Sequence, residues 1–139
     1  MSGPVLTSSR GAQFRPPLCW PLMPVPDSEG RLAFPTLEDS IRQRIESVLR
    51  TSPGEQLMRP GFGAGLELLV HQPNTVEVRA RAQETIRQAI LAYEPRVTLD
   101  GVDVVAGADP RELLVTVSYR IRATASAGQI SARVPVGAA

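Results

Sequence analysis

The sequence predicts an α+β protein in which two amphipathic helices pack on a small antiparallel sheet of three or more strands, behind an extended proline-rich N-terminal arm. Apolar residues recur at helical spacing in two segments, and the spacing changes to a period of two after Pro95. Prolines gather at the start, where residues 1–35 hold 7 of the 13 in the chain. Because 139 residues is close to the usual size of one domain, we expect residues 36–139 to form a single domain and residues 1–35 to form the arm.

The N-terminal arm is rich in prolines, which exclude a regular helix and most sheet ladders. It also carries large apolar residues such as Phe14 and Trp20, which a disordered tail usually lacks. We therefore expect the arm to dock its apolar side chains on its own domain or on a neighbouring molecule. Within the arm, the run from Asp27 to Gly30 has the composition of a turn.

The first helix is predicted to begin after Thr36, because Thr36 and Asp39 resemble a capping box with Asp in place of the usual Glu or Gln. Its apolar positions fall on one face: Leu37, Ile41, Ile45, Val48 and Leu49. The pattern ends at Pro53, which cannot continue a helix. The glycine-rich segment 54–73 follows as a loop, in which residues 66–70 fit either a short strand or a helical turn.

The second helix is predicted to open at residues 73–75 and to stop at a charged corner. Its apolar stripe consists of Val78, Ala82, Ile86, Ala89, Ile90 and Tyr93. Pro95 ends the helix and moves Glu94 out of the α region, because its ring clashes with a helical residue before it. The opposite charges of Glu94 and Arg96 therefore flank a rigid proline, and we expect this corner to hold a partner or a loop.

After the corner, apolar and polar residues alternate as in strands, with a bulge or turn expected near Gly101. Residues 113–123 form the clearest strand. Its apolar side chains point to one face, and Arg120 and Arg122 point to the other. A last strand is expected over residues 130–136. Short turns between the strands predict an antiparallel meander.

A three-stranded meander has two edges with unpaired backbone groups, and such edges can accept a strand from a partner. The last strand is only lightly protected, by Arg133 and Pro135. Two interpretations stay open at this point. Either a partner's strand completes an edge, or the proline-rich arm covers it within the same chain.

The composition argues against several classes of function. The chain has 15 basic and 14 acidic residues, a net charge of +1, so no strong field attracts nucleic acid or an anionic membrane. No apolar run is long enough to cross a bilayer. Cys19 and His71 are the single residues of their types, which leaves no thiolate or imidazole cluster for a metal. We predict neither a metal nor a cofactor.

Three carboxylates near the predicted helix ends raise the alternative of a glycoside hydrolase: Glu55, Glu67 and Glu94. Such an enzyme needs two carboxyl groups, one of which stays protonated as a general acid. Arg59 follows Glu55 closely in the sequence, and Arg96 lies beside Glu94. Because a neighbouring cation favours the ionised carboxylate, we predict no catalytic residues.

Four motifs follow one another over roughly residues 28–125. They are Gly30-Arg31-Leu32, Ile41…Ile45…Leu49-Arg50-Thr51, Pro53-Gly54-Glu55…Met58-Arg59-Pro60…Phe62-Gly63, and Glu94-Pro95-Arg96 before the strands. In this order they resemble the small baseplate wedge proteins of contractile phage tails and related injection systems, including the type VI secretion baseplate. Members are also called sheath initiators or tail-lysozyme-like baseplate proteins. Gln56 departs from the family, which usually has arginine there, and this removes one expected ionic contact.

The resemblance implies a structural role at the junction of baseplate and sheath, where the sheet accepts strands from the sheath protein and the Glu-Pro-Arg corner contacts the helical core bundle of the wedge. It also implies tube or spike-hub proteins as further neighbours, six copies per ring, and assembly in the bacterial cytoplasm as part of a phage tail or injection particle. The lysozyme label supplies one alternative, a peptidoglycan-degrading hydrolase, and a free-standing adaptor is another. The residues that we predict to bind partners are Glu94, Pro95, Arg96, Glu55, Arg59, Arg120, Arg122, Ile130, Arg133 and Val134.

Overall fold

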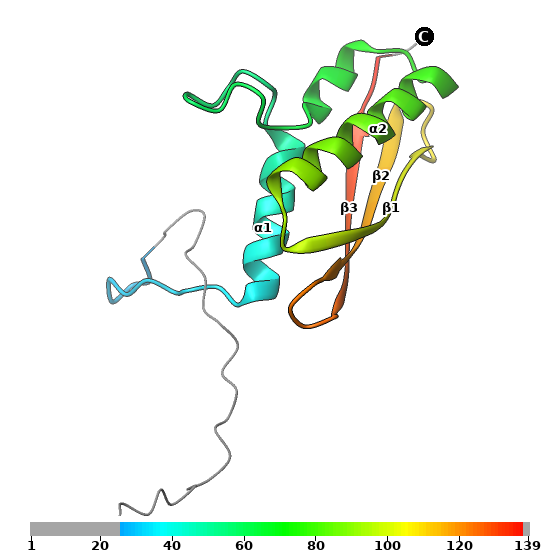
Figure 1. Ribbon diagram of the computed structural model, residues 1–139. Coiled ribbons are helices and arrows are strands. Elements are labelled where there is room, and N and C mark those ends of the chain that lie inside the picture. Colours follow the sequence, from blue (N-terminus) through cyan, green and yellow to red (C-terminus); the bar gives the residue numbers. More distant parts are fainter. Residues whose placement is uncertain (1–25, 138–139) are drawn as a thin grey trace, which may run out of the picture.

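The computed structural model describes residues 26–137. Its elements are α1 (Leu37–Arg50), the 3-10 helix η1 (Leu66–His71), α2 (Val76–Tyr93), β1 (Val97–Ala106), β2 (Glu112–Ile121) and β3 (Ala127–Pro135). The strands form one antiparallel sheet in the order β1-β2-β3. Helix α2 crosses one face of this sheet, and α1 stands beside it on the β3 side (Figure 1). The predicted α+β class and the antiparallel meander are confirmed.

Helix α1 begins where the sequence predicts, because Thr36 caps it. The hydroxyl oxygen of Thr36 accepts the backbone N–H of Asp39 at 3.2 Å, and the hydroxyl donates to the Asp39 carboxylate at 2.8 Å. Glu38 and Asp39 lie in the first turn and Arg50 lies in the last, which suits the helix dipole. The five predicted apolar positions are all buried: Leu37, Ile41, Ile45, Val48 and Leu49.

Helix α2 is capped in the same way, by a hydrogen bond from the Val78 N–H to the hydroxyl of Thr75 at 3.3 Å. Four residues of its predicted stripe are buried: Ala82, Ile86, Ala89 and Ile90. Val78 and Tyr93 are partly buried at the two ends of the stripe. The segment that fitted either a strand or a helical turn forms η1. Within residues 26–137, no helix is both long enough and apolar enough to span a bilayer.

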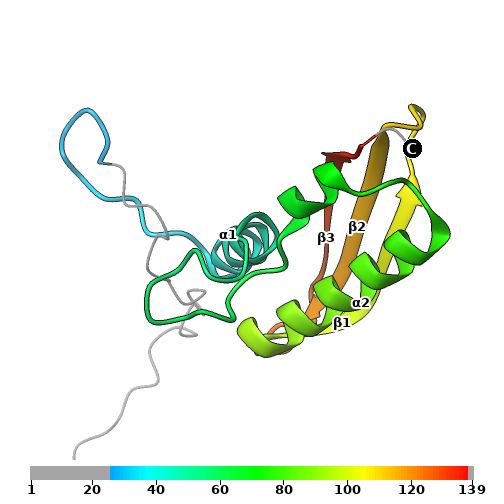
Figure 2. The same ribbon diagram turned by 90° about the horizontal axis from the view of Figure 1, so that it is seen from above.

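The sheet contributes the other half of the core. The β1–β2 register shifts between Leu99 and Gly101, so the predicted bulge is confirmed. Alternate side chains of β2 face the helices and are buried: Leu113, Val115, Val117, Tyr119 and Ile121. They form one cluster with the apolar faces of α1 and α2. In the view from above, neither α1 nor α2 covers the other face of the sheet (Figure 2).

The main differences from the prediction are two strand boundaries. Strand β3 begins at Ala127, three residues before the predicted start at residue 130. Strand β2 ends at Ile121, two residues before the predicted end at residue 123, and Arg122 begins a turn. The turn closes locally, because the Ala125 N–H donates to the Ile121 carbonyl at 2.8 Å and the Ile121 N–H donates to the Ser126 carbonyl at 2.8 Å. Ala125 adopts a left-handed conformation, with φ of 56°. A residue other than glycine in this conformation gives the sequence no clear signal for the turn.

The described part of the arm, residues 26–35, contains the predicted turn. The Asp27 carboxylate accepts the backbone N–H groups of Glu29 and Arg31, at 2.9 Å and 2.8 Å. Leu32 and Phe34, which were expected to dock, are exposed here. The rest of the arm lies outside the described residues, so its docking and the division of the chain at residue 35 stay predictions.

Candidate partner-binding surfaces

Glu94 and Arg96 form an ion pair with each other at the corner between α2 and β1. The Arg96 Nη2 atom lies 2.6 Å from Glu94 Oε2, and Arg96 Nε lies 2.7 Å from Oε1. This is the two-bond geometry in which a guanidinium binds a carboxylate most strongly. The backbone N–H of Arg96 also donates to Oε1, at 3.2 Å. Because the Glu94 side chain is 1% exposed, its charge is neutralised inside the chain.

Two residues from distant parts of the chain complete this corner. Arg96 Nη1 donates to the hydroxyl of Ser40 on α1, at 3.2 Å. The Arg122 N–H donates to the Arg96 carbonyl at 3.0 Å, and Arg122 Nε donates to the Val97 carbonyl at 3.3 Å. The corner therefore ties α1, the α2–β1 junction and the β2–β3 turn together. Removing one partner of a buried ion pair of this kind typically costs about 3–5 kcal/mol.

Glu55 and Arg59 lie on the loop between α1 and η1. The Glu55 carboxylate accepts the backbone N–H of Ser52 at 2.7 Å, in place of the contact with Arg59 that the sequence suggested. The Arg59 carbonyl accepts the N–H of Phe62 at 3.0 Å. Both charged side chains are exposed, so they remain accessible to a partner.

The base of this loop is fixed by an aromatic residue and a glycine. Phe62 is fully buried, meets the Tyr93 ring edge-on with centroids 4.9 Å apart, and has the Arg44 guanidinium 5.1 Å from its own centroid. Gly63 adopts a φ of 113°, and a Cβ there would overlap the Thr51 carbonyl. Only glycine meets both requirements, so the loop leaves α1 in a defined direction.

Strand β3 presents one unpaired backbone edge. Two hydrogen bonds of 2.8 Å mark the ends of its ladder with β2: Val136 N–H to the Arg111 carbonyl, and Ile121 N–H to the Ser126 carbonyl. Since bonding alternates along an antiparallel ladder, the N–H and C=O groups of Gln129, Ser131 and Arg133 point away from β2. Within residues 26–137 no strand pairs with this outer edge of β3.

The outer edge of β3 has a defined end. Pro135 occupies the next outward-facing position, where its missing N–H removes no bond from the ladder. Just beyond it, Gly137 forms a parallel bridge with Pro73. A groove of about 760 Å³ runs beside this edge, lined by Arg50, Leu66, Glu67, Val70, His71, Ser131, Ala132, Arg133, Val134 and Pro135. The side chains of Ile130 and Val134, both predicted to bind partners, are buried in the core.

The open face of the sheet carries the arginine and hydroxyl side chains that the alternation predicted. Arg120 on β2 pairs across the ladder with Asp100 of β1 at 3.6 Å, and both side chains are exposed. The hydroxyls of Thr116 and Ser131 lie 3.5 Å apart on neighbouring strands. Exposed pairs at these distances contribute little to stability, which leaves this face available for contacts.

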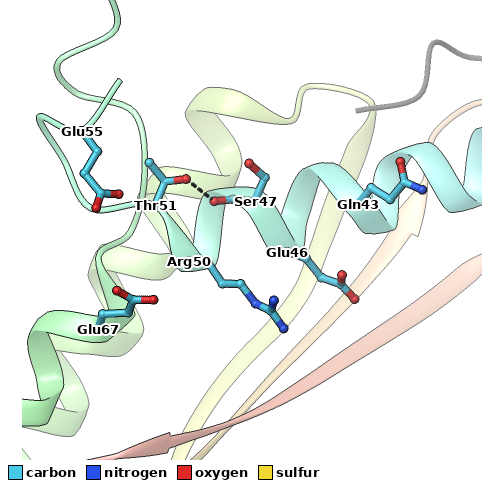
Figure 3. Close-up of a pocket in the computed structure, with 7 residues that line it drawn as sticks. All are labelled: Gln43, Glu46, Ser47, Arg50, Thr51, Glu55 and Glu67. Carbon is cyan, nitrogen blue, oxygen red and sulfur yellow. Dashed lines mark hydrogen bonds between the residues drawn. The ribbon is translucent and has the colours of Figure 1, made fainter. Parts of the chain in front are cut away.

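A surface pocket of about 520 Å³ beside the end of α1 gathers several carboxylates: Glu46, Glu55 and Glu67. Arg50 extends between Glu46 and Glu67, and the Thr51 hydroxyl donates to the Ser47 carbonyl at 2.7 Å (Figure 3). Glu55 and Glu67 are exposed, whereas a general acid usually sits in an apolar pocket. Across residues 26–137, no three His, Cys, Asp or Glu side chains are placed to hold a metal ion.

Comparison with known proteins identifies the family. The family described as "Baseplate wedge protein gp25" matches residues 35–126. Baseplate protein W of Escherichia phage P2 is 31% identical over 98 residues, which cover 70% of this chain and 83% of that protein. The chain therefore belongs to the baseplate wedge protein family, whose members are structural components of contractile tails. The family resemblance found in the sequence motifs is confirmed.

Solved structures share the fold. A protein from Geobacter sulfurreducens, assigned only provisionally as a tail lysozyme, matches with a TM-score of 0.68 at 25% identity and covers 76% of this chain and 96% of its own. A chain of the anti-feeding prophage baseplate matches with a TM-score of 0.59 at 19% identity, over 86% and 85% of the two chains. A chain of a type VI secretion baseplate complex matches with a TM-score of 0.58 at 14% identity, over 72% and 93%. At such identities the last two show the fold alone.

Sequence reasoning missed part of each surface. The contact of Ser40 with Arg96 joins residues 56 positions apart, and no local pattern predicts such a pairing. The backbone groups of Gln129 and Ser131 point outward because of the hydrogen-bonding pattern between β2 and β3. That pattern depends on the β2–β3 register, which the sequence does not give. The apolar pair Leu57 and Met58, between Pro53 and Pro60, could have been noticed as an unusual composition for a turn.

Proposed function

We propose that this chain is a non-catalytic subunit at the junction of baseplate and sheath, where the outer edge of β3 accepts a strand from the sheath protein. The observation that carries the proposal is the unpaired edge formed by Gln129, Ser131 and Arg133 beside a groove of about 760 Å³. Strand addition needs outward-pointing backbone groups and lateral room for a second backbone about 4.8 Å away. This edge offers the backbone groups, and the groove between it and η1 offers space beside Ser131 and Arg133.

The ends of the edge support a short, directed strand addition. Pro135 and the Gly137–Pro73 bridge close the edge at its C-terminal end, so an incoming strand pairs only with the residues before Pro135. The outward N–H and C=O groups of three residues provide up to six backbone hydrogen bonds, each with a net gain of about 1 kcal/mol. Repetition around a ring then multiplies weak contacts through avidity.

The corner of Glu94, Pro95 and Arg96 is the proposed contact with the helical core bundle of the wedge. Its two charges neutralise each other, so it offers a partner a rigid surface and no unpaired ion. The Arg96 side chain is 39% exposed and Pro95 is exposed, and these two residues form the accessible part of the corner. Family membership supports three further parts of the proposal. These are contacts with tube or spike-hub proteins, six copies per ring, and assembly in the bacterial cytoplasm.

The rival function is peptidoglycan hydrolysis, which the provisional lysozyme assignment of the Geobacter protein brings forward. It requires two carboxyl groups in a cleft, one of them in an apolar setting. Here Glu94 is paired with Arg96, while Glu55 and Glu67 share an open pocket with Arg50. Purified protein is expected to leave peptidoglycan intact. Turnover that disappears on changing any one of these glutamates would overturn the structural assignment.

The experiment on the edge uses two proline variants. Ser131→Pro removes an outward N–H of β3 without removing a ladder bond, so we expect a folded protein that assembles baseplates with few or no sheaths. Ala106→Pro is the matched control, because Ala106 is an exposed outward position at the end of the β1 edge. Sheathed particles are counted by electron microscopy, and folding is checked by circular dichroism. Normal sheaths on particles that contain folded Ser131→Pro would refute the proposal.

A further inference from the structure

The tip of the loop between α1 and η1 exposes two large apolar side chains completely. Leu57 is 95% exposed and Met58 is 97% exposed, whereas the other exposed large apolar side chains of the described chain range from 37% to 68%. This loop projects from the end of α1 away from the rest of the domain (Figure 1). Two neighbouring side chains with so little contact contribute almost nothing to the isolated fold.

The backbone at this tip is strained at a residue other than glycine, Met58. The Arg59 N–H donates to the Gln56 carbonyl at 3.3 Å and closes a turn with Leu57 and Met58 at its centre. Met58 has a φ of 67°, at the turn position where glycine is normally required. Strained residues of this kind cluster at functional sites, and among residues 26–137 the Met58 side chain makes almost no contact, since it is 97% exposed.

The tip is presented on a fixed base. The Ala64 N–H donates to the Val48 carbonyl at 2.8 Å, and the Gly65 N–H donates to the Thr51 carbonyl at 3.0 Å. Phe62 anchors the same end of the loop in the core. Because the loop is already held in one direction, a partner that binds its tip pays little ordering entropy.

The base of the loop lies beside the charged corner, because the Phe62 ring packs against Tyr93, the residue before Glu94. Ser40 contacts Arg96, Arg44 lies over the Phe62 ring, and the carbonyls of Val48 and Thr51 hold the loop. Ser40 and Arg44 are one helical turn apart on α1, and the two carbonyls lie at its C-terminal end. The loop lies on the side of α1 away from the sheet (Figure 2), which separates its tip from a strand added to β3.

We propose that Leu57 and Met58 insert together into an apolar pocket of the same baseplate protein that contacts the corner. The inference rests on the proposed wedge contact and adds its anchor. An apolar centre surrounded by a polar rim is the usual anatomy of an energetic hot spot. Here the rim consists of Glu55, Gln56 and Arg59. The unbranched Met58 side chain adapts to the shape of such a pocket.

The first experiment replaces side chains in the full-length chain, expressed in cells that form the particle. Met58→Gly removes the side chain and relieves the strained φ, so the free protein should unfold at the same temperature as the wild type or higher, while particle yield falls at least tenfold. Leu57→Ser should have the same effect on yield. Val76→Ser, at another exposed apolar residue, is the control and should assemble normally. A wild-type yield with Met58→Gly would overturn the proposal, because a purely structural role is improved by glycine.

The second experiment identifies the occupant. A benzoylphenylalanine placed at Leu57 should crosslink in assembled particles to the protein that the same probe captures at Pro95. A crosslink from position 57 to the sheath protein, to a second copy of this chain or to lipid overturns the proposal, and so does no crosslink. A crosslink from Pro95 without one from Leu57 would refute the proposed apolar anchor and support the proposed contact at the corner. If neither position crosslinks, the proposed contact with the wedge is refuted as well. The Ser131→Pro variant tests the proposed contact with the sheath independently.

Discussion

The charged corner and the outer edge of β3 were both predicted to bind partners, and the structure treats them in opposite ways. At the corner, the Glu94 carboxylate is paired with Arg96 and tied to Ser40. At the edge, the outward backbone groups of Gln129, Ser131 and Arg133 have no partner strand within the described residues. The conspicuous charges are therefore paired within the fold, whereas the inconspicuous backbone groups of β3 have no partner strand in residues 26–137.

The difference follows from burial. A carboxylate that is 1% exposed must be paired, because an unpaired buried charge costs several kcal/mol. An edge amide of the free chain bonds to water instead, so it costs little until a partner replaces the water. The two regions should thus respond differently to substitution. Corner variants should change the stability of the free protein, and edge variants should change assembly alone.

The largest effect is expected for Arg96→Ala, which leaves the Glu94 carboxylate buried without its guanidinium. We expect the free energy of unfolding to fall by about 3 kcal/mol, at the low end of the range for breaking a buried pair. The low end applies because the Arg96 side chain is 39% exposed and water can enter. Urea denaturation of the purified protein measures the change.

The double variant Glu94→Gln with Arg96→Ala is the control for this prediction. It removes the buried charge as well as its partner, so part of the lost stability should return. If Arg96→Ala alone leaves the denaturation midpoint unchanged, the ion pair does not hold the corner together, and the contrast between corner and edge disappears.

A smaller effect is expected for Arg122→Ala. Its Nε atom donates one long hydrogen bond, 3.3 Å, to the Val97 carbonyl, and its backbone N–H bond to Arg96 survives the substitution. A single hydrogen bond of this kind contributes about 1 kcal/mol. Thermal unfolding should therefore show a modest decrease. A loss as large as that of Arg96→Ala would mean that the guanidinium of Arg122 is a main support of the corner.

The smallest effect on stability is expected for Arg120→Ala on the open face of the sheet. Its pair with Asp100 is exposed and 3.6 Å long, and such pairs are worth about 0–1 kcal/mol. The melting temperature should stay within about 2 °C of the wild type. A marked drop would show that the open face, like the corner, is held by its own charges.

Local signals in the sequence predicted most of the fold. Thr36 and Thr75 mark both helix starts because an N-cap acts within three residues. Pro95 marks the end of the second helix, and the period-two pattern marks the strands. The predicted end of strand β2 at residue 123 was two residues too late, because the turn after Ile121 uses a left-handed alanine, Ala125, and nothing in the composition reports that conformation.

The candidate surfaces were predicted less completely, because they depend on register and on distant contacts. Ile130 and Val134 were assigned to the correct strand, yet their side chains face the core and the edge belongs to their neighbours. The identity of the buried pair could be read from Glu94-Pro95-Arg96. The hydrogen bond from Arg96 to Ser40 could not be predicted from the sequence, because it depends on how α1 packs against the end of α2.

Hydrogen exchange of the β3 backbone tests the central claim most directly. In the free protein, the amides of Gln129, Ser131 and Arg133 should exchange rapidly, while the alternate amides bonded to β2 are protected. In the sheathed particle, the same three amides should become protected, because a sheath strand then accepts their hydrogen bonds. Rapid exchange at these three positions in the assembled particle would contradict the proposal that the edge is completed by a partner.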